Sequence, residues 1–338
     1  MTKQFWNGRT VLVTGATGLL GGWLVKQLLR ERAEVIAIVR DHSPSSMAVS
    51  EKLLDRCVVV RGSITDAALV SRTLAEYSPK TVFHLAAQTQ VGTAQKDPVG
   101  TLEANVQGSW VLLQACRECN TPQVLVASSD KAYGASDDLP YLETHPLLGR
   151  FPYEVSKSCC DLIAQMYAIT YALPVCILRC GNLFGGGDLN FARAIPGVIR
   201  DTLNGRRFAI RSDGKCVRDF LYVEDAVRAY MRVAECLEEN PSLSGEAFNF
   251  SMEVKLSVLE IVDKVLRVMD REDLVPIVQN TASNEIREQY MLSTKARDLL
   301  NWAPVFDMEE GLTRTVDWYR EHFASVEESE NSYDAVTG

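Results

Sequence analysis

The sequence contains no apolar run long enough to cross a membrane, and no signal-peptide-like apolar segment precedes its first predicted strand. It also lacks an excess of basic residues, because 44 Asp and Glu against 35 Lys and Arg give a formal net charge of −9. This acidic balance argues against a general nucleic-acid binder, although it is compatible with a local basic pocket. We therefore expect a cytoplasmic protein with no membrane and no nucleic acid among its partners.

Histidine and paired cysteines are also scarce. The chain has four histidines, and His84 lies within an apolar run, so we expect it to be a core residue rather than a catalytic one. The nine cysteines are scattered, and Cys116 and Cys119 have C-x-x-C spacing without the second pair that a zinc site needs. We expect free thiols that pack as small hydrophobic groups, and no metal site.

What the sequence does contain is a glycine-rich turn between its first predicted strand, Arg9–Thr14, and its first predicted helix, Gly22–Arg30. Of its three regularly spaced glycines, the first allows a tight turn, the second lets backbone approach a pyrophosphate, and the third allows close helix packing. The helix N-terminus then offers free N–H groups to the phosphates. The residues predicted to bind a dinucleotide here are Gly15, Thr17, Gly18, Leu19, Leu20 and Gly21.

The ends of the next predicted strands supply the rest of the cofactor site. The strand Glu34–Val39 is followed by Arg40 and Asp41; an acidic residue suits the ribose diol of NAD, and an arginine suits the extra phosphate of NADP. Because the arginine comes first, we predict NAD(P) with a lean to NADP through Arg40. Two further strands are predicted to place the following residues near the cofactor: Ser63, Ile64, Leu85, Ala86 and Ala87.

Strands and helices alternate from Arg9 to Arg179, which predicts an α/β fold with a doubly wound parallel Rossmann sheet. After Arg179 the alternation weakens, and we expect a smaller C-terminal α/β domain for substrate. The predicted dinucleotide-binding domain is 1–179 plus about 219–239, and the predicted substrate domain is 180–218 plus about 240–324. Residues 325–338 are acidic and unpatterned, and we expect them to be disordered.

The strongest catalytic signal follows the apolar strand Val124–Ala127. In open parallel sheets ligands lie outside the carboxyl ends of the strands, and this end presents Ser129, Asp130 and Lys131. Tyr153 and Lys157 lie one helical turn apart, so that the ammonium can lower the tyrosine pKa and make the tyrosine a base. The alternative interpretation is a helix N-cap at the strand end and a chance Tyr–Lys spacing.

The segment after Arg179 carries a glycine-rich loop, Gly181–Asp188, which is suited to close approach of backbone to a ligand. Arginines are frequent between residues 193 and 218 for so acidic a chain. Because their planar forks match phosphate geometry, we expect some of them to clamp a diphosphate and about half to line a solvated face.

Together these motifs resemble the extended short-chain dehydrogenase/reductases that act on nucleotide sugars, over nearly the whole chain. Within this epimerase/dehydratase family, Ser129-Asp130-Lys131 looks most like the CDP-glucose 4,6-dehydratases. Residues 39–41 resemble the NADP-using GDP-mannose 4,6-dehydratases instead, so the nucleotide stays open. The resemblance rests on Thr14–Gly21, His84–Ala87, Asn105, Tyr153-x-x-x-Lys157, Arg179-x-x-Asn182, Gly185–Asp188 and Arg218–Ala226.

The resemblance implies a 4,6-dehydratase that converts an NDP-hexose, CDP-glucose-like or GDP-mannose-like, to the NDP-4-keto-6-deoxyhexose, with hydride recycled on a tightly bound NAD(P). It implies that Tyr153 beside Lys157 takes the C4 hydroxyl proton and that Ser129 binds the reacting oxygen. Asp130 would protonate the departing C6 hydroxyl, and Lys131 would act as the C5 base or stabilise the enolate. The alternatives are an NDP-sugar 4-epimerase or reductase, and a non-catalytic nucleotide-binding protein.

The same resemblance implies a substrate site and an assembly. The helices expected near 98–119 and 153–171 look too apolar to face water on all sides, and such helices pair in this family, so we expect a homodimer. The residues expected to contact the nucleotide sugar are Gln88, Asn182, Arg193, Arg211 and Arg218.

Overall fold

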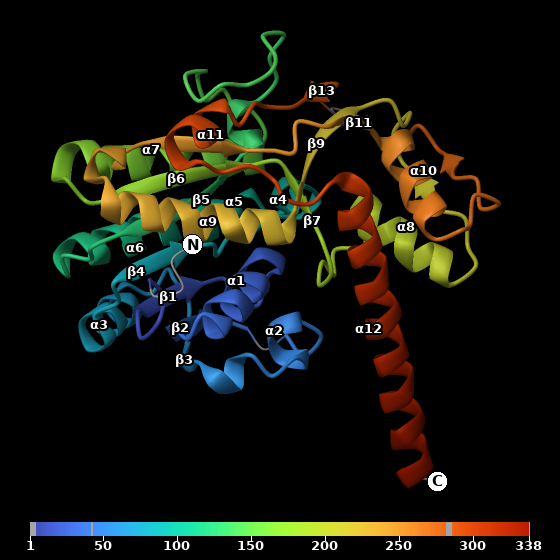
Figure 1. Ribbon diagram of the computed structural model, residues 1–338, viewed down its shortest axis with the longest axis horizontal. Helices are drawn as coiled ribbons and strands as arrows, with labels where there is room; N and C mark the ends of the chain where they lie inside the picture. The colour runs from blue at the N-terminus through green and yellow to red at the C-terminus, as the bar shows by residue number, and fades with distance from the viewer. Residues whose placement is uncertain (1–4, 42, 282–285, 338) are drawn as a thin grey trace.

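A parallel sheet covered by helices on both faces forms the larger part of the structure, a computed structural model that describes residues 5–41, 43–281 and 286–337 (Figure 1). A smaller group of strands and helices, with α8 and α10, lies to one side of it, and the long helix α12 projects away from the body (Figure 1). Within the described residues, no helix is long and apolar enough to span a membrane.

The large sheet has seven strands in the order β10-β6-β5-β4-β1-β2-β3, and every neighbouring pair is parallel. Its central strands are Val-, Ile- and Leu-rich and buried, because helices cover both faces. The direction of winding changes between β1 and β4, where a ligand crevice is expected at the strand ends. The predicted doubly wound sheet is thus confirmed, with β1 (Thr10–Thr14), β2 (Glu34–Val39), β3 (Val58–Arg61), β4 (Thr81–His84), β5 (Val124–Ser129), β6 (Val175–Cys180) and β10 (Ala247–Phe250).

Two helical layers enclose this sheet. On one face α1 packs against α9, and their apolar side chains share a core cluster with Phe83 and Leu125 of the sheet. On the other face α3 contacts α6, and α6 contacts α7. These layers contain α1 (Leu19–Arg30), α2 (Met47–Ser50), α3 (Ala67–Tyr77), α4 (Val91–Lys96), α5 (Pro98–Leu102), α6 (Gly108–Glu118), α7 (Pro152–Tyr171) and α9 (Val223–Glu239). A π-helical turn, Glu103–Gln107, joins α5 to α6, so the helix expected near 98–119 is continuous.

The smaller part is built on a four-stranded sheet and has its own core, which includes Ile199, Val262 and Leu312. The helix α10 begins with a capping box, in which the Ser257 and Glu260 side chains each bond the other's backbone N–H. The elements of this part are β7 (Asn182–Phe184), α8 (Ala194–Leu203), β8 (Ala209–Ile210), β9 (Val217–Tyr222), β11 (Lys255–Ser257), α10 (Val258–Val268), β12 (Ile277–Val278), β13 (Glu288–Gln289) and α12 (Met308–Thr337).

Three predicted boundaries differ from the structure. Residues 247–250 were expected in the substrate domain, but they form β10 and complete the large sheet beside β6, and α11 (Thr294–Leu300) packs on them. Residues 219–222, expected in the dinucleotide domain, belong to β9 of the smaller sheet. Most of the tail expected to be disordered, 325–338, is helical, because α12 continues to Thr337.

Candidate active site

The polar residues expected at the end of β5 lie together at a strand-to-turn junction. β5 ends at Ser129, and a 3-10 turn, Asp130–Tyr133, follows directly. Ser129 Oγ accepts from the backbone N–H of Lys131 at 3.2 Å, so the N-cap interpretation is right for this side chain. Ser129 Oγ also donates to Asp130 Oδ1 at 2.9 Å, and Lys131 Nζ lies 2.9 Å from Asp130 Oδ2.

Asp130 and Lys131 do not face solvent, as a surface cap and a surface charge would. The Asp130 side chain is 2% exposed and that of Lys131 is 17% exposed. Burial lowers the pKa of Lys131, and the positive charges of Arg218 and Arg193 lower it further, whereas the Asp130 carboxylate raises it. The junction therefore holds a buried carboxylate and an amine that is easier to deprotonate than an ordinary lysine.

Tyr153 and Lys157 come to the same junction from the first turns of α7. Lys157 Nζ donates to the carbonyl oxygen of Ala127 in β5 at 2.8 Å, which fixes the start of α7 against the strand end. Burial raises the pKa of Tyr153, and the Asp130 charge adds to the rise, whereas a hydrogen bond with Ser129 and the Arg193 charge lower it. The expected lowering of this pKa by Lys157 is therefore wrong for the protein alone, because burial dominates and the pKa of Lys157 is itself lowered by burial.

A buried polar network next to this junction connects β6, α7, the 3-10 turn and β10. Arg179 of β6 donates from Nε and Nη2 to Asp161 of α7 at 2.8 and 2.9 Å, and from Nη1 to Tyr133 Oη at 2.8 Å. Tyr133 Oη donates to Asn249 Oδ1 of β10 at 2.7 Å. The bidentate Arg179–Asp161 pair locks α7 to the sheet, and the Tyr133–Asn249 hydrogen bond links the 3-10 turn to β10. Sequence reasoning missed Asp161, although its spacing of four from Lys157 places both on one helix face.

The smaller part contributes two buried groups to the junction that sequence reasoning also missed. Gln289 of β13 is fully buried, and its Nε2 donates to the backbone oxygen of Asp130 at 3.4 Å. Asp219 of β9 accepts from Ser251 Oγ at 2.7 Å and from Met291 N at 3.1 Å, and burial raises its pKa to about 8. No local pattern marks Gln289, because only the fold brings it to a turn so distant in the sequence.

The glycine turn has the geometry that a dinucleotide requires. Gly15 has φ +74°, and a side chain there would meet the backbone of Ala86, while a Cβ on Gly21 would lie 2.0 Å from the oxygen of Gly15. Around Gly18 a Cβ would meet only the Gly15 oxygen, at 3.4 Å, so this side of the turn is open. No side chain caps the first turn of α1, and none of its residues is acidic, so its N–H groups fit a pyrophosphate.

The end of β4 is tied to β1 by a buried hydrogen-bond network. Thr14 Oγ1 accepts from the N–H groups of Leu85 and Ala86 at 3.1 Å each. His84 is buried with Thr14 and Ser109 as its partners, and burial lowers its pKa to about 3, so the predicted core histidine is confirmed. Leu85 and Ala86 are thus bound to β1 at the end of β4, and Ala87 follows one residue further on.

Some of the residues that follow β2 and β3 line a small cavity, and others pack in the core. A cavity of about 150 Å³ beside Thr17 is lined by Val39, Asp41, Asp55 and Arg61 among others, and Arg40 is not one of the lining residues. Arg40 instead points to the surface and pairs with Asp41 at 2.6 Å. Ser63 Oγ bonds Thr65 Oγ1 at 2.8 Å. Ile64 packs in the core, where its side chain fills the space that a Cβ on Gly108 would need.

The side chains expected to bind the sugar nucleotide differ in the hydrogen bonds that they make within the protein. Gln88 Nε2 donates to the Gln90 oxygen at 2.9 Å, and Asn182 Nδ2 donates to the Asp219 oxygen at 3.1 Å. Arg218 Nη1 donates to the oxygens of Val217 and Ile286 at 2.9 and 2.7 Å. Arg211 is exposed, with one long bond of 3.5 Å to Ala192 O.

Gly185 and Gly186 of the glycine-rich loop are in close contact with side chains of the protein. A Cβ on Gly185 would lie 2.3 Å from Val223 Cγ1, and one on Gly186 would lie 2.2 Å from Trp318 Cγ. Gly186 O also accepts from Trp23 Nε1 at 2.7 Å. The loop is therefore pressed against α1, α9 and α12 by side chains of the protein.

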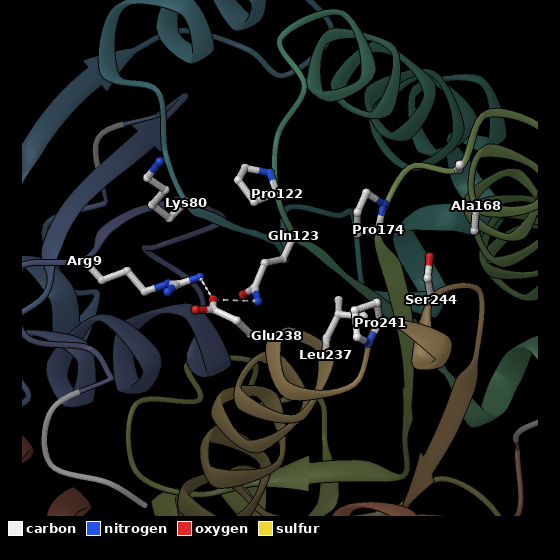
Figure 2. A pocket seen from close by; sticks show the side chains of 11 residues that line it. Arg9, Lys80, Pro122, Gln123, Ala168, Pro174, Leu237, Glu238, Pro241 and Ser244 are labelled. Carbon is white, nitrogen blue, oxygen red and sulfur yellow. Dashed lines mark hydrogen bonds and ion pairs between the residues drawn. The ribbon is translucent and has the colours of Figure 1, made fainter.

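A cavity of about 780 Å³ lies at the opposite, amino-terminal edge of the sheet (Figure 2). Figure 2 shows Arg9, Gln123 and Glu238 meeting at its floor, where Glu238 accepts from both of the others. Because these polar groups are paired with one another, and because parallel sheets bind ligands at the other edge, the floor is a structural contact between strands and α9.

The sheet, its glycine turn and the Tyr153–Lys157 helix define the class of the protein as that of the short-chain dehydrogenase/reductases. The chain belongs to the NAD dependent epimerase/dehydratase family, which it matches over residues 11–250. It is 33% identical over 320 residues to a dTDP-glucose 4,6-dehydratase of Mycolicibacterium smegmatis (92% of this chain, 93% of that protein). It is 30% identical over 336 residues to a CDP-glucose 4,6-dehydratase of Salmonella typhimurium (94% and 92%).

The solved structures add an epimerase to these relatives. The UDP-glucose 4-epimerase of Thermotoga maritima with UDP-glucose has a TM-score of 0.84 to this chain, with 27% identity and 93% and 99% of the two chains covered. The protein is therefore an epimerase/dehydratase of the nucleotide-sugar type, and its relatives divide between water elimination and epimerisation.

Proposed function

We propose that this protein is a nucleotide-sugar 4,6-dehydratase that turns an NDP-hexose into the NDP-4-keto-6-deoxyhexose. The observation that carries the proposal is the buried ion pair of Asp130 and Lys131, with 2.9 Å between Nζ and Oδ2; Ser129 is hydrogen-bonded to Asp130 and lies between this pair and Tyr153. An epimerase needs a base for the C4 hydroxyl but no acid for a leaving group. A buried acid and amine beside that base match what elimination of water requires.

The first step is oxidation at C4 of the sugar. A bound nicotinamide supplies the acceptor of hydride and later returns it to C6. Tyr153 removes the proton of the C4 hydroxyl, Ser129 holds the C4 oxygen by a hydrogen bond, and Lys157 carries a positive charge at the base of the crevice. The C4 ketone that results makes the C5 proton acidic. Lys131 and Asp130 then act in the elimination of the C5 proton and the C6 hydroxyl.

A single proton transfer within the Lys131–Asp130 ion pair produces both the base and the acid that the elimination of water needs. If the proton on Lys131 Nζ moves across the 2.9 Å hydrogen bond to Asp130 Oδ2, the pair becomes a neutral amine and a neutral acid. The amine takes the C5 proton while the acid protonates the departing C6 oxygen, and the pair is charged again. Burial lowers the pKa of Lys131 and so favours the neutral form that this exchange needs.

The protons of this scheme balance within the residues of the chain. Tyr153 gains one proton from the C4 hydroxyl and Asp130 loses one to the water that leaves, while Lys131 returns its proton to C5. The proton on Tyr153 can reach Asp130 through Ser129, which is hydrogen-bonded to Tyr153 and donates to Asp130 Oδ1 at 2.9 Å. After each turnover the three side chains are thus restored without an outside acid.

The proposal is tested by incubating the protein and NAD(P) with CDP-, dTDP-, GDP- and UDP-hexoses, followed by mass spectrometry of the sugar nucleotides. We expect one of them to lose one molecule of water. A product of unchanged mass with inverted C4 would instead make the protein a 4-epimerase, as in the Thermotoga relative. Binding of the cofactor without conversion of any sugar would support a non-catalytic nucleotide-binding protein.

We further propose that the cofactor is NAD rather than NADP. This differs from the slight preference for NADP that the sequence suggested through Arg40. The cavity beside Thr17 is lined by two carboxylates, Asp41 and Asp55, and by one cation, Arg61, while Arg40 lies outside it and pairs with Asp41, so the lining offers acceptors for a ribose diol rather than a group of cations for a phosphate. We expect NAD to bind more tightly than NADP in titrations of intrinsic fluorescence. Asp41→Ala should reduce this preference by about tenfold, the effect of removing one such charge contact. Tighter binding of NADP by the unaltered protein would refute the assignment.

We also propose a homodimer that pairs α6 and α7 with their counterparts in a second copy. Ile169 is 80% exposed and Leu162 is 55% exposed on α7, and Trp110 is 46% exposed on the neighbouring α6. A group of large apolar side chains on adjacent helices is typical of an interface. Light scattering should give a dimer, and Ile169→Asp should give a monomer. Ile277→Asp, on an exposed apolar position of the smaller part, is the control and should leave the mass unchanged.

A further inference from the structure

The 3-10 turn Asp130–Tyr133 is contacted by residues 289–292 of the smaller part. This segment begins with Gln289, the last residue of β13, which is paired in parallel with β9. The Met291 N–H donates to Asp219 Oδ2 of β9 at 3.1 Å. Gln289 and Met291 are 0% and 1% exposed. The 289–292 segment is therefore fixed to the smaller sheet at its first and third residues.

Tyr141, in the loop that follows the turn, is bound to the 289–292 segment. It forms a parallel bridge with Met291. The Tyr141 N–H donates to the Tyr290 oxygen at 2.9 Å, and the Tyr141 oxygen accepts from Leu292 N at 3.2 Å. The Tyr141 side chain is fully buried. The backbone of Tyr141 is thus held by the smaller part through two hydrogen bonds.

Gln289 and Tyr141 together contact the 3-10 turn at its start, its middle and its end. Gln289 Nε2 donates to the backbone oxygen of Asp130 at 3.4 Å. The Tyr141 ring stacks on the Tyr133 ring, with 4.7 Å between the centroids and 11° between the planes. The Tyr141 hydroxyl donates to the backbone oxygen of Gly134, the residue after the turn. Burial raises the pKa of Tyr141 to about 12, so the hydroxyl keeps the proton that it donates.

The same turn is also bound to α7. Ser158 Oγ of α7 donates to the Ala132 oxygen at 2.8 Å, and α7 carries Tyr153 and Lys157. A 3-10 turn of four residues has few hydrogen bonds of its own, so its place depends on contacts from outside. The position of Asp130 relative to Tyr153 is therefore set by contacts of the turn with both α7 and the smaller part.

We propose that Tyr141 and Gln289 are positioning residues, through which the smaller part holds the 3-10 turn where Asp130 and Lys131 can act on the sugar. The inference rests on the proposed function for its catalytic consequence. It goes beyond that function because it gives the smaller part a role in placing the acid and the base of elimination. The contacts themselves can be tested whether or not the protein eliminates water.

The first test measures how firmly the turn is held. Hydrogen–deuterium exchange of the full chain, followed by mass spectrometry, reports the backbone amides of residues 131–134. Tyr141→Phe keeps the ring and removes the hydrogen bond to the Gly134 oxygen. Exchange of the turn amides should therefore rise about fivefold, the effect of losing one buried hydrogen bond.

Gln289→Met is a second variant that acts on the other end of the turn. It should also raise the exchange of the turn amides, but by less, because the bond from Gln289 to the Asp130 oxygen is long. The amide oxygen of Gln289 is buried and has no hydrogen-bond partner among the described residues. The variant removes this unpaired acceptor as well, so its melting temperature should stay close to that of the unaltered protein.

The control is Tyr290→Phe in the same segment, because the backbone oxygen of Tyr290, and not its hydroxyl, bonds Tyr141. It should leave the exchange of the turn amides unchanged. If these amides exchanged in Tyr141→Phe and in Gln289→Met as they do in the unaltered protein, the two side chains would not hold the turn and the proposal would be overturned.

The second test applies once a sugar nucleotide is found to be converted. Tyr141→Phe should slow elimination by about tenfold to a hundredfold, the usual cost of misplacing a reacting group by about 1 Å. It should leave C4 oxidation nearly unchanged, because Tyr153 is carried by α7. Reduced nicotinamide should therefore accumulate during turnover, which near-ultraviolet absorbance measures.

This partition distinguishes positioning from a general loss of structure, which would slow both steps alike. Equal slowing of C4 oxidation and elimination, or no slowing of either, would overturn the positioning role. If no sugar is converted, the proposed function fails, while the exchange result still decides whether Tyr141 and Gln289 hold the turn.

Discussion

Replacing Asp130 by Asn should leave C4 oxidation working and nearly stop the loss of water. Asn has the same shape but no proton of suitable acidity for the C6 oxygen, and general acid catalysis contributes roughly a hundredfold to ten-thousandfold in rate. The variant should therefore accumulate reduced nicotinamide and the 4-keto sugar. Near-ultraviolet absorbance of the reduced cofactor and mass spectrometry of the trapped sugar measure this directly.

The control for this variant is Asp138→Asn, because Asp138 lies in the loop that follows the same turn and its side chain is 86% exposed. It should turn over at the normal rate. Asp130→Asn also leaves the Lys131 ammonium without its partner in a buried place, so its thermal melting should be compared with that of the unaltered protein. Unchanged turnover in a folded Asp130→Asn variant would eliminate the dehydration mechanism.

Replacing Tyr153 by Phe should abolish the first step, and reduced nicotinamide should not appear. The phenolic oxygen is the group placed to remove the C4 proton, so the loss is expected to be roughly a thousandfold, within the range of general base catalysis. Burial raises the pKa of Tyr153, so its base form is scarce at neutral pH in the protein alone. The rate of C4 oxidation by the unaltered protein should therefore rise with pH, and this rise should be absent in Tyr153→Phe.

The matched control is Tyr171→Phe, at the exposed end of the same helix, where the ring is 44% exposed. It should keep both the rate and its pH dependence. A Tyr153→Phe variant that still reduced the nicotinamide at a similar rate would assign the base to another residue, and Lys131 would be the next to examine.

The sequence predicted those features that local patterns encode. The strand–glycine–helix unit at Thr10–Arg30 was predicted because apolar periodicity and glycine spacing are both local. The same is true of β5 with its polar end, and of Tyr153 and Lys157 at helical spacing. From these patterns we predicted that Ser129, Asp130 and Lys131 lie at the same strand end as the start of α7, and the structure places them there.

The features that the sequence did not reveal depend on long-range contacts. Gln289 and Asp219 reach the junction only through the fold of the smaller part, and nothing in their neighbourhoods marks them as buried. The Tyr153 pKa was misjudged because spacing shows that a lysine is near but not how much water both groups lose. Arg193 was assigned to phosphate because arginine suits phosphate, and the sequence could not show that Asp188 and Leu183 also bind its guanidinium.

The place of β10 in the large sheet has a consequence for how the protein is made. β6 pairs with β5 on one side and with Ala247–Phe250 on the other, and the second partner follows β6 by almost seventy residues that belong largely to the smaller part. While the nascent chain is still shorter than this, β6 is an open apolar edge that can pair with other chains. Fragments that stop after the first two hundred residues should therefore aggregate during synthesis, and ribosome-associated chaperones should be needed until β10 has emerged.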